Sequence, residues 1–356
     1  MGVYLAAQLR SGGMRVIGVS NRTRYWQHYV FSQPPEGYRY SRMIDVPWHV
    51  LKVEQQFLAH TKLFFPVKHA DMYHTYNGIV ANRKPWVIEV ESYLPRYRPM
   101  SEDHFLSKWA VRRLASADCK WILFSSQNAA RMNREKLIAQ GVDPAKMDVL
   151  YRAVERYLPA ERSRELFEVL FVGNGFYRKG GIELLKAFQR IDRSDIRLTI
   201  LSSMEIDWGV LPTDAEVRWA QEYIAWDTRI SWKPGVPHAE VVQYMRRADV
   251  FVNTTFGDTF NNAVMEAMAC QLPVIASEVS ALPEMIENGV NGWQVPVQGR
   301  TSEDIADELA HRLLMLMDDR EGRERMGRAS AAVAADRFEI NKRNARLKEL
   351  YDDALR

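Results

Sequence analysis

The sequence predicts an α/β protein with two domains, each built around a parallel β-sheet. A chain of 356 residues is longer than one core usually needs and suits two α/β domains. Short apolar runs alternate along it with amphipathic stretches of helical period, which is the pattern of successive βα units. Near the middle, the charged, proline-containing segment Arg152–Arg164 interrupts this alternation and predicts an interdomain linker.

The first domain is expected over residues 1–160. Its predicted strands are Arg15–Ser20, Tyr38–Arg42, Asp71–His74, Trp86–Glu91, Trp121–Ser125 and Met147–Tyr151. We take the run from Met14 to Ser20 as the first strand, which makes residues 1–13 an extension and Tyr25–Phe31 the next short helix. Alternatively, residues 2–10 form a helix whose preceding strand is missing.

The second domain is expected over residues 166–335. Its predicted strands are Glu168–Gly173, Arg197–Leu201, Ile230–Trp232, Val250–Asn253 and Pro273–Ala276. Helical periodicity is clear in Gly181–Ile191, Glu240–Arg247, Asn262–Ala269 and Asp304–Met317. The alternation again predicts a parallel sheet covered by helices.

The composition is that of a globular protein and argues against a membrane-spanning one. With 47% hydrophobic and 26% charged residues, the chain is typical of a globular protein. We find no apolar run of the roughly 18 residues that a membrane helix needs, and no basic leader ahead of an apolar segment. Cys119 and Cys270 stand alone, without the spacing of a metal site, which favours a reduced, cytoplasmic setting.

The net charge of +3 conceals an asymmetry between the two halves of the chain. Residues 1–164 hold 25 Lys and Arg against 14 Asp and Glu. Residues 165–356 hold 23 Lys and Arg against 31 Asp and Glu. A basic first half that is rich in aromatic residues can face an anionic membrane surface or an anionic acceptor, although basic solvated faces are also common. The basic residues are scattered and match no binding module, so we expect no nucleic-acid partner.

The segment Asn253–Ala276 carries the clearest chemical signal. An apolar strand leads into a loop with Asp258, then into a helix with Glu266, then into a second strand. Eight residues of helix span roughly 12 Å, about the separation between the ribose and the sugar of a nucleotide diphosphate sugar. The helix start between the two acids offers free N–H groups and a positive dipole end, which suit a diphosphate. The alternative is two acids that merely solvate a helix.

A second signal is the segment Phe171–Gly181, in which a strand ends in a glycine-rich turn before an amphipathic helix. The turn places two cations, Arg178 and Lys179, at a helix start, which predicts another phosphate contact. Gly173 and Gly175 have the spacing of the dinucleotide fingerprint, but Arg178 stands where its third glycine belongs. The alternative is a flexible turn with solvated basic residues.

Together the two segments resemble glycosyltransferase family 4, the retaining enzymes of GT-B fold ("glycosyl transferases group 1" type). The family's motifs follow in order as Glu266-Ala-Met-Ala, Pro273-Val-Ile-Ala276, Pro283-Glu284 and Asn288-Gly-Val-Asn-Gly292. The resemblance covers residues 168–351. It implies two Rossmann-like domains with parallel sheets facing across a cleft, and a helix over residues 336–356 that crosses back to the first domain.

The resemblance implies roles for individual residues around the donor. Lys179, helped by Arg178 after the strand that ends at Gly173, would neutralise the diphosphate. Glu266 would hold the ribose hydroxyls, and Asp258 would contact the transferred sugar.

Further donor contacts are implied nearby. His238 would lie near the base of the nucleotide. Backbone amides near three residues would face the sugar and phosphate: Phe260, Asn261 and Asn262. The chain departs from the family at Asn261, where a glycine is usual, and at Asn174, where many members carry a phosphate-binding Arg.

On the acceptor side the resemblance is weaker. Family members often have a His at the end of the strand that corresponds to Trp86–Glu91, facing the anomeric carbon. Here Glu91 stands nearest that position and would orient the acceptor hydroxyl or stabilise positive charge; the alternative is a structural ion pair with Arg96. His74, which ends another predicted strand, is either a site residue or a core histidine.

The implied activity is transfer of a hexose-type sugar from a UDP- or GDP-sugar to a glycan or lipid-linked acceptor in polysaccharide biosynthesis. Lys179, Asp258 and Glu91 would be its catalytic residues, with no metal ion and no cofactor besides the nucleotide sugar. Two alternatives remain: a sugar phosphorylase or epimerase of GT-B fold, and a catalytically silent module that binds a sugar nucleotide.

Overall fold

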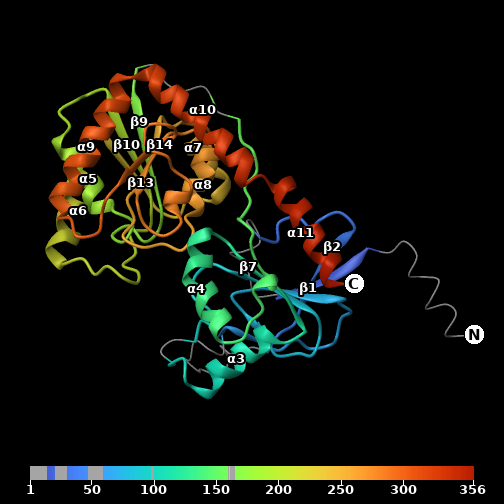
Figure 1. Cartoon of the computed structure of the whole chain (residues 1–356). Helices are drawn as coiled ribbons and strands as arrows, with labels where there is room; N and C mark the ends of the chain where they lie inside the picture. The colour runs from blue at the N-terminus through green and yellow to red at the C-terminus, as the bar shows by residue number, and fades with distance from the viewer. Residues whose placement is uncertain (1–13, 21–29, 47–58, 98–99, 159, 161–164) are drawn as a thin grey trace, which may run out of the picture. The chain divides into compact units, whose positions relative to one another are not determined.

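The computed structural model describes residues 14–20, 30–46, 59–97, 100–158, 160 and 165–356. The chain divides into two compact units, shown in Figure 1: the first comprises Met1–Ala153 and Ile340–Arg356, and the second comprises Val154–Glu339. The division after Ala153 lies inside the expected linker, earlier than the expected border at residue 160. At the other end, helix α10 (Arg320–Arg337) runs through the border expected at residue 336.

The first unit contains a parallel six-stranded sheet in the order β2-β1-β4-β6-β7-β8. Its strands are β1 (Arg15–Ser20), β2 (Tyr38–Met43), β4 (Met72–Tyr76), β6 (Trp86–Val90), β7 (Cys119–Phe124) and β8 (Met147–Val149). The other elements are β3 (Thr61–Lys62), β5 (Ile79–Val80), α3 (Phe105–Ala115), α4 (Gln127–Ala139), the 3-10 turn η3 (Pro144–Lys146) and α11 (Ile340–Ala354).

All six strands predicted for this unit are confirmed to within a few residues. Every residue of β4 and β6 is buried, as expected for apolar strands in a parallel sheet covered on both faces. The strands β3 and β5 and the helices α3 and α4 were not predicted. The expected extension over residues 1–13 and most of the expected helix Tyr25–Phe31 lie outside the described residues.

The second unit contains another parallel sheet, in the order β11-β10-β9-β12-β13-β14. Its strands are β9 (Phe167–Val172), β10 (Ile196–Leu201), β11 (Ile230–Lys233), β12 (Val250–Asn253), β13 (Val274–Ser277) and β14 (Gly292–Val295). Its helices are α5 (Gly181–Arg190), α6 (Asp214–Trp226), α7 (His238–Arg247), α8 (Asn262–Ala269), η4 (Leu282–Glu284), α9 (Ser302–Asp318) and α10.

The strand order of the second unit defines where a ligand can bind. From β9 the chain proceeds outward through β10 to β11, and from β12 it proceeds the other way through β13 to β14. The two directions diverge between β9 and β12, and ligands of open α/β sheets bind at such a switch point, outside the carboxyl ends of the strands. Helix α5 packs against α6 and α9, α8 packs against α7 and α10, and α9 and α10 contact each other (Figure 1).

Helix α11 completes the core of the first unit, although it follows the whole second unit in sequence. Leu347, Leu350 and Tyr351 join one apolar cluster with residues of β1 and β6. Arg343 of the same helix is buried and forms an ion pair with Glu89 of β6. The helix implied for residues 336–356 therefore begins at Ile340 and belongs to the first unit. Whether the two sheets face each other across a cleft stays a prediction.

Candidate functional site

Two loops of the second unit meet at its switch point: the β9–α5 turn and the β12–α8 loop. Gly180 allows this close approach, because it is left-handed at the N-cap of α5 and a Cβ there would lie 2.3 Å from Oγ1 of Thr254. Gly173, where φ is +153°, makes room within its own turn, since a Cβ there would lie 2.4 Å from Cδ of Lys179. A larger residue at position 180 would push the two loops apart, and one at position 173 would displace the Lys179 side chain.

The approach of the loops brings Lys179 and Asp258 together. The Lys179 Nζ atom lies 3.6 Å from Oδ2 of Asp258, and the two side chains are 15% and 18% exposed. Both groups are therefore accessible to a ligand and only partly screened by solvent. Two predicted site residues that are 79 positions apart in sequence thus form one polar cluster at the carboxyl ends of β9 and β12.

Arg178 occupies a different environment from the one predicted for it. Its guanidinium group is 8% exposed and donates to the carboxylate of Asp207 at 2.6–3.0 Å. It also donates from Nη1 to the carbonyl oxygen of Gly257 at 2.5 Å, and it lies 4.5 Å from the ring centroid of Trp208. Its nearest approach to Asp258 is 3.9 Å. Arg178 thus connects its own β9–α5 turn with the loop that contains Asp207 and with the β12–α8 loop. Its contact with a diphosphate stays a prediction.

The start of α8 explains the departure from glycine at residue 261. Asn261 is the N-cap, its side chain accepts a hydrogen bond from the backbone N–H of Val264, and its φ of −81° suits any residue. Its amide also donates to Oδ1 of Asn253 at 2.9 Å. Asn262 begins the helix, and Phe260 is buried with its ring edge-on to Phe338. The site therefore tolerates an Asn here, because the residue caps the helix.

His238 and Glu266 form the second polar pair of this unit. His238 is the first residue of α7, and its Nε2 lies 2.6 Å from Oε1 of the buried Glu266. The hydrogen bond to Glu266 raises the pKa of His238, against the opposing effect of partial burial. Tyr157 lies in the same electrostatic environment: burial, then the charges of Glu266 and Glu155, raise its pKa to about 12.

In the first unit, Glu91 is held by four side chains. Its carboxylate accepts hydrogen bonds from Tyr76 at 2.6 Å, from Asn77 at 3.0 Å, and from Arg96 and Arg152 at 2.5 Å each. Burial alone would raise its pKa, but the charge of Arg152, the Tyr76 hydrogen bond and Arg96 outweigh it and lower the pKa. The ion pair with Arg96 is thus the structural alternative named above, while a role at the anomeric carbon stays a prediction.

His74 is a core residue of the first unit. It is fully buried, its Nδ1 lies 2.5 Å from the hydroxyl of Tyr351, and its Nε2 lies 3.3 Å from Glu89. Burial lowers its pKa in spite of the opposing hydrogen bond to Glu89. The imidazole has no solvent-accessible surface, which matches the core histidine named above as the alternative, and a role of His74 on the acceptor side stays a prediction.

The sequence did not reveal several polar residues near the candidate sites. Arg152, at the start of the expected linker, is 3% exposed, and its carboxylate partner Glu91 lies 61 positions away. His60 is close to the charges of Arg96 and Glu91; burial and then Arg96 lower its pKa to about 4. Asp207 and Trp208, beside Arg178, were also missed. No local motif could have found them, because each depends on a tertiary contact.

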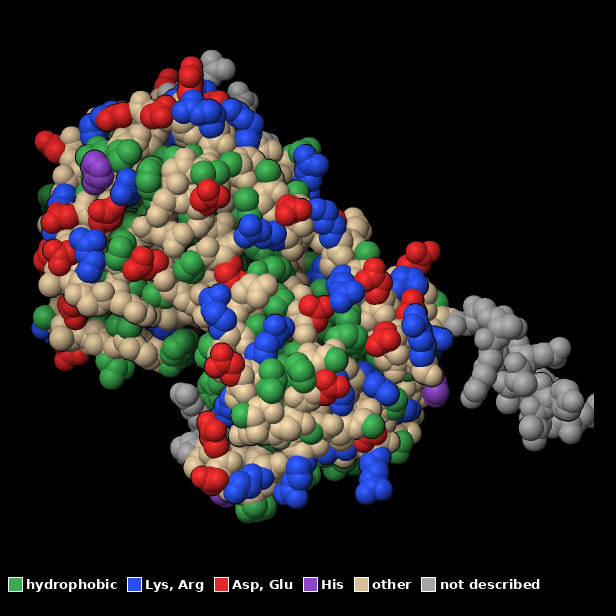
Figure 2. Space-filling view, in the orientation of Figure 1, with side chains coloured by type: hydrophobic (Ala, Val, Ile, Leu, Met, Phe, Trp, Pro, Cys, Tyr) green, Lys and Arg blue, Asp and Glu red, His purple; other side chains and the backbone are tan. Residues whose placement is uncertain are grey.

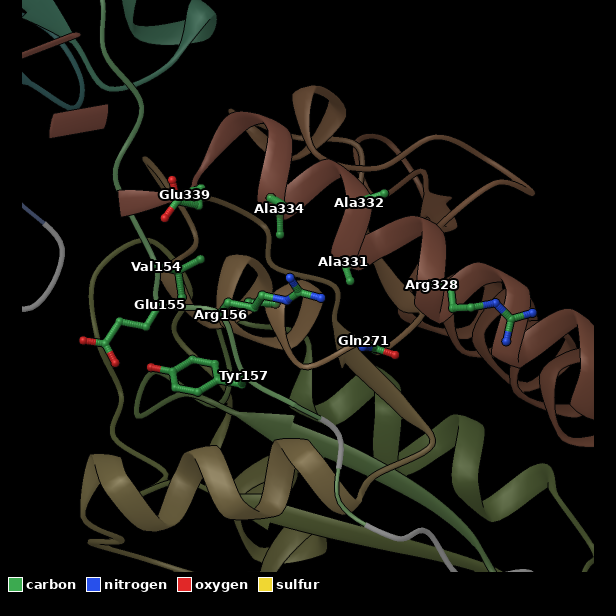
Figure 3. Close-up of a pocket in the computed structure, with 12 residues that line it drawn as sticks. Val154, Glu155, Arg156, Tyr157, Gln271, Arg328, Ala331, Ala332, Ala334 and Glu339 are labelled. Carbon is green, nitrogen blue, oxygen red and sulfur yellow. The ribbon is translucent and has the colours of Figure 1, made fainter. Parts of the chain in front are cut away.

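Figure 3 shows a separate cavity of the second unit, of about 280 Å³. The start of the unit forms one wall and α10 the other, and the Arg156 side chain extends beneath Ala331 and Ala334 of α10. None of the predicted site residues lines it. Tyr157, on its wall, is electrostatically coupled to Glu266.

The described residues lack two features that would change the assignment of the site. No group of three or more His, Cys, Asp or Glu side chains is arranged to hold a metal ion. Within the same residues, no helix combines the length and the apolarity needed to cross a membrane.

Solved structures share this architecture. A glycosyltransferase from Rickettsia africae aligns over 97% of this chain and 99% of its own with a TM-score of 0.67 at 13% identity. The Anabaena protein HepE, crystallised with UDP and glucose, aligns over 89% and 86% with a TM-score of 0.59 at 18% identity. With two parallel α/β units, the fold is that of the GT-B glycosyltransferases.

Sequence comparison finds a family match in the second unit. Residues 167–319 match the family model "Glycosyl transferases group 1". A D-inositol 3-phosphate glycosyltransferase from Pseudarthrobacter chlorophenolicus is 31% identical over 252 residues, 67% of this chain and 55% of the relative. One from Paenarthrobacter aurescens is 29% identical over 265 residues, 73% of this chain and 62% of the relative. The chain thus matches little more than half the length of these relatives. Residues 167–319 carry the sequence pattern of the group 1 glycosyltransferases.

Proposed function

We propose that this chain transfers a hexose-type sugar from a nucleotide diphosphate sugar to a hydroxyl group of a glycan or lipid-linked acceptor, with retention of anomeric configuration and without a metal ion. The observation that carries the proposal is the approach of Lys179 to within 3.6 Å of Asp258, beside the N-terminus of α8 at the switch point of the sheet. A cation, a helix start and a carboxylate there match the diphosphate and the hydroxyls of one ligand.

Each group has a separate role in the proposal. Lys179 and the positive dipole end at the start of α8 hold the diphosphate and stabilise the charge that it gains as it leaves. Glu266, which is buried and already hydrogen-bonded to His238, holds the ribose hydroxyls. Asp258 contacts the transferred sugar.

Every bond and proton of the proposed reaction is accounted for without a metal ion. The bond from the anomeric carbon to the diphosphate oxygen breaks, and a bond to the acceptor oxygen forms. The acceptor hydroxyl loses a proton, which the departing diphosphate can accept. Such a path needs no free base in the first unit, which suits the buried His74 and the fully paired Glu91.

The names of similar proteins indicate which donor and acceptor to test first. Because HepE was crystallised with UDP-glucose, we propose a UDP-sugar as the first donor to test. Because the relatives are named D-inositol 3-phosphate glycosyltransferases, a phosphorylated polyol is the first acceptor to test beside glycans.

An anionic acceptor or membrane surface also suits the charge of the chain, since residues 1–164 carry the excess of Lys and Arg. On the face of the described residues seen in Figure 2, basic and acidic side chains are interspersed. We propose a cytoplasmic protein that contacts an anionic membrane surface through scattered basic residues.

One observation favours a second candidate function, a catalytically silent module that binds a sugar nucleotide. Among the acceptor-side candidates, His74 is buried and Glu91 is fully paired with arginines. A silent module would bind the donor through Lys179 but would neither hydrolyse nor transfer it.

The test compares the wild type with Lys179→Ala and, as a matched control, Lys186→Ala, which removes a lysine paired with Glu303 elsewhere in the second unit. Binding of UDP and GDP is measured by calorimetry, and release of diphosphate is followed with a panel of sugar nucleotides. Loss of a charge-assisted contact of about 1.5–3 kcal/mol predicts binding roughly 10–150-fold weaker for Lys179→Ala. Unchanged affinity in the folded variant would place the diphosphate elsewhere. Binding without turnover would support the silent module.

A further inference from the structure

The loop between β10 and α6, residues 202–213, exposes large apolar side chains beside the candidate donor site. Ile206 is 54% exposed, Trp208 is 64% exposed and Leu211 is 84% exposed. Each such side chain forgoes the stabilisation that burial would give, and clusters of them on a soluble protein commonly mark a binding surface. Trp208 offers the largest of these surfaces.

The indole of Trp208 is held in a defined position. The buried guanidinium group of Arg178 lies 4.5 Å from its ring centroid, within the range of a cation–π contact. Arg178 is itself fixed by Asp207, the residue before Trp208, and by the carbonyl group of Gly257. A Cβ on Gly175 would lie 2.1 Å from Oδ2 of Asp207, so the glycine there leaves room for the carboxylate that holds Arg178. One face of the ring is therefore covered by a fixed cation, and much of the remaining surface is open.

The ring also lies beside the loop that carries Asp258. A Cβ built on Gly257 would be 3.8 Å from two atoms of the six-membered ring of Trp208. Asp258 follows Gly257 directly, and its carboxylate lies 3.6 Å from Lys179. The exposed aromatic ring and the carboxylate are thus presented by adjoining backbone segments, within the span of one small ligand.

We propose that Trp208 is a stacking platform for the pyranose ring of the donor, next to Asp258. This inference rests on the proposed function. A pyranose has a flat patch of C–H groups that packs on an aromatic ring, while its hydroxyls remain free to bond to a carboxylate. The other occupant to consider is an anionic bilayer, but residues 202–213 include Glu205 and Asp207 and no Lys or Arg. Asp207 and Arg178 neutralise each other, so the loop offers no cation that would attract anionic headgroups, and the Glu205 carboxylate would repel them.

The test measures the affinities of UDP and UDP-glucose separately by calorimetry, with GDP and GDP-mannose as the second pair. The variants are Trp208→Ala, Trp208→Phe and Trp226→Ala. Trp208→Phe keeps an aromatic ring at this position. Trp226→Ala is a control that removes another exposed tryptophan of the same unit, at the end of α6.

We expect Trp208→Ala to bind the nucleoside diphosphate as the wild type does and to bind the matching sugar nucleotide on the order of tenfold more weakly. Trp208→Phe should recover much of that loss, and Trp226→Ala should show none.

Three results would overturn the assignment of Trp208: no change in Trp208→Ala, an equal loss for both ligands, or binding to phosphatidylglycerol vesicles that depends on Trp208. If the wild type binds neither diphosphate nor sugar nucleotide, the proposed function itself fails, and the inference fails with it.

Discussion

Glu91→Gln separates a structural role of this residue from a catalytic one. The substitution keeps the size of the side chain and one acceptor oxygen but removes the negative charge. That charge faces Arg152, which is 3% exposed and lies 2.5 Å away. The variant therefore leaves a buried guanidinium group without its counter-ion. Tyr76 and Arg96 also lose the carboxylate to which they donate.

The expected cost follows from the burial of this pair. Removing one partner of a buried ion pair typically costs about 3–5 kcal/mol, and an isosteric amide should fall near 3 kcal/mol. The first unit comprises about 170 residues, for which 1 kcal/mol shifts the Tm by roughly 2–4 °C. We therefore expect the transition of the first unit to fall by about 6–12 °C.

Differential scanning calorimetry of the full chain measures this shift, with Arg346→Ala as a control that removes an exposed arginine paired with Asp148. The double variant Glu91→Gln with Arg152→Met should recover more than half of the loss, because no buried charge then remains unpaired. The pKa of Glu91 is lowered in the folded state, so its contribution is present above the ordinary value of 4.5 and is lost as the pH falls through the lower folded pKa. The gap between wild type and Glu91→Gln should accordingly narrow in acid.

A different outcome would refute this reasoning. If Glu91→Gln keeps the Tm of the wild type, binds the donor normally and loses most transfer, Glu91 acts in the reaction and its arginine partners position it. A loss of Tm with normal turnover per folded molecule would establish the structural role.

Three further predictions concern the second unit. Glu266→Gln should weaken binding of free nucleoside diphosphate, whereas Asp258→Asn should leave that binding nearly unchanged and lower turnover with the whole donor; equal losses in calorimetry would contradict the division of ribose and sugar. The pKa of His238 is raised by Glu266, so the stability of the pair is present at low pH and is lost as the pH rises through the folded pKa; the Tm deficit of His238→Ala should be larger at pH 6 than at pH 9. Asn261→Ala should cost about 1 kcal/mol of unfolding free energy for the lost N-cap and about 1 kcal/mol more for the lost hydrogen bond to Asn253; Asn261→Gly should cost less than Asn261→Ala, because glycine is tolerated at an N-cap, and both are measured by thermal unfolding.

The strands could be predicted from the sequence because their burial is local and continuous. Runs such as Trp86–Val90 are apolar enough to identify a buried strand without knowing its neighbours. Strand β14 was missed because Trp293 and Gln294 are only partly buried, so its four residues form no continuous apolar run. Helix α10 was missed because it packs through small residues: a Cβ on Gly327 would lie 2.3 Å from the carbonyl oxygen of Gln271, and Ser330 is fully buried. Such a face has no apolar stripe.

The candidate site was predictable where one loop or turn carries it. Lys179 and Asp258 each lie in a motif, and the parallel sheet brings the motifs together. The ion pairs were not predictable, because they join residues far apart in sequence: Arg178 with Asp207, Arg152 with Glu91 and Arg343 with Glu89. Sequence identifies the two acids of Trp86–Glu91 as unusual for a core strand, but it does not identify the arginines that neutralise them.

The position of α11 has a consequence for the order in which the chain can fold as it is synthesised. The second unit is continuous in sequence, so all of its residues have left the ribosome before Ile340 emerges. The first unit, although made first, lacks Leu347, Leu350 and Tyr351 of its core until the final residues appear. Until α11 is synthesised, Glu89 also lacks its ion-pair partner Arg343, and His74 lacks the hydroxyl group of Tyr351. Domains generally fold as units during synthesis, so the part of the chain translated first should be the part that matures last.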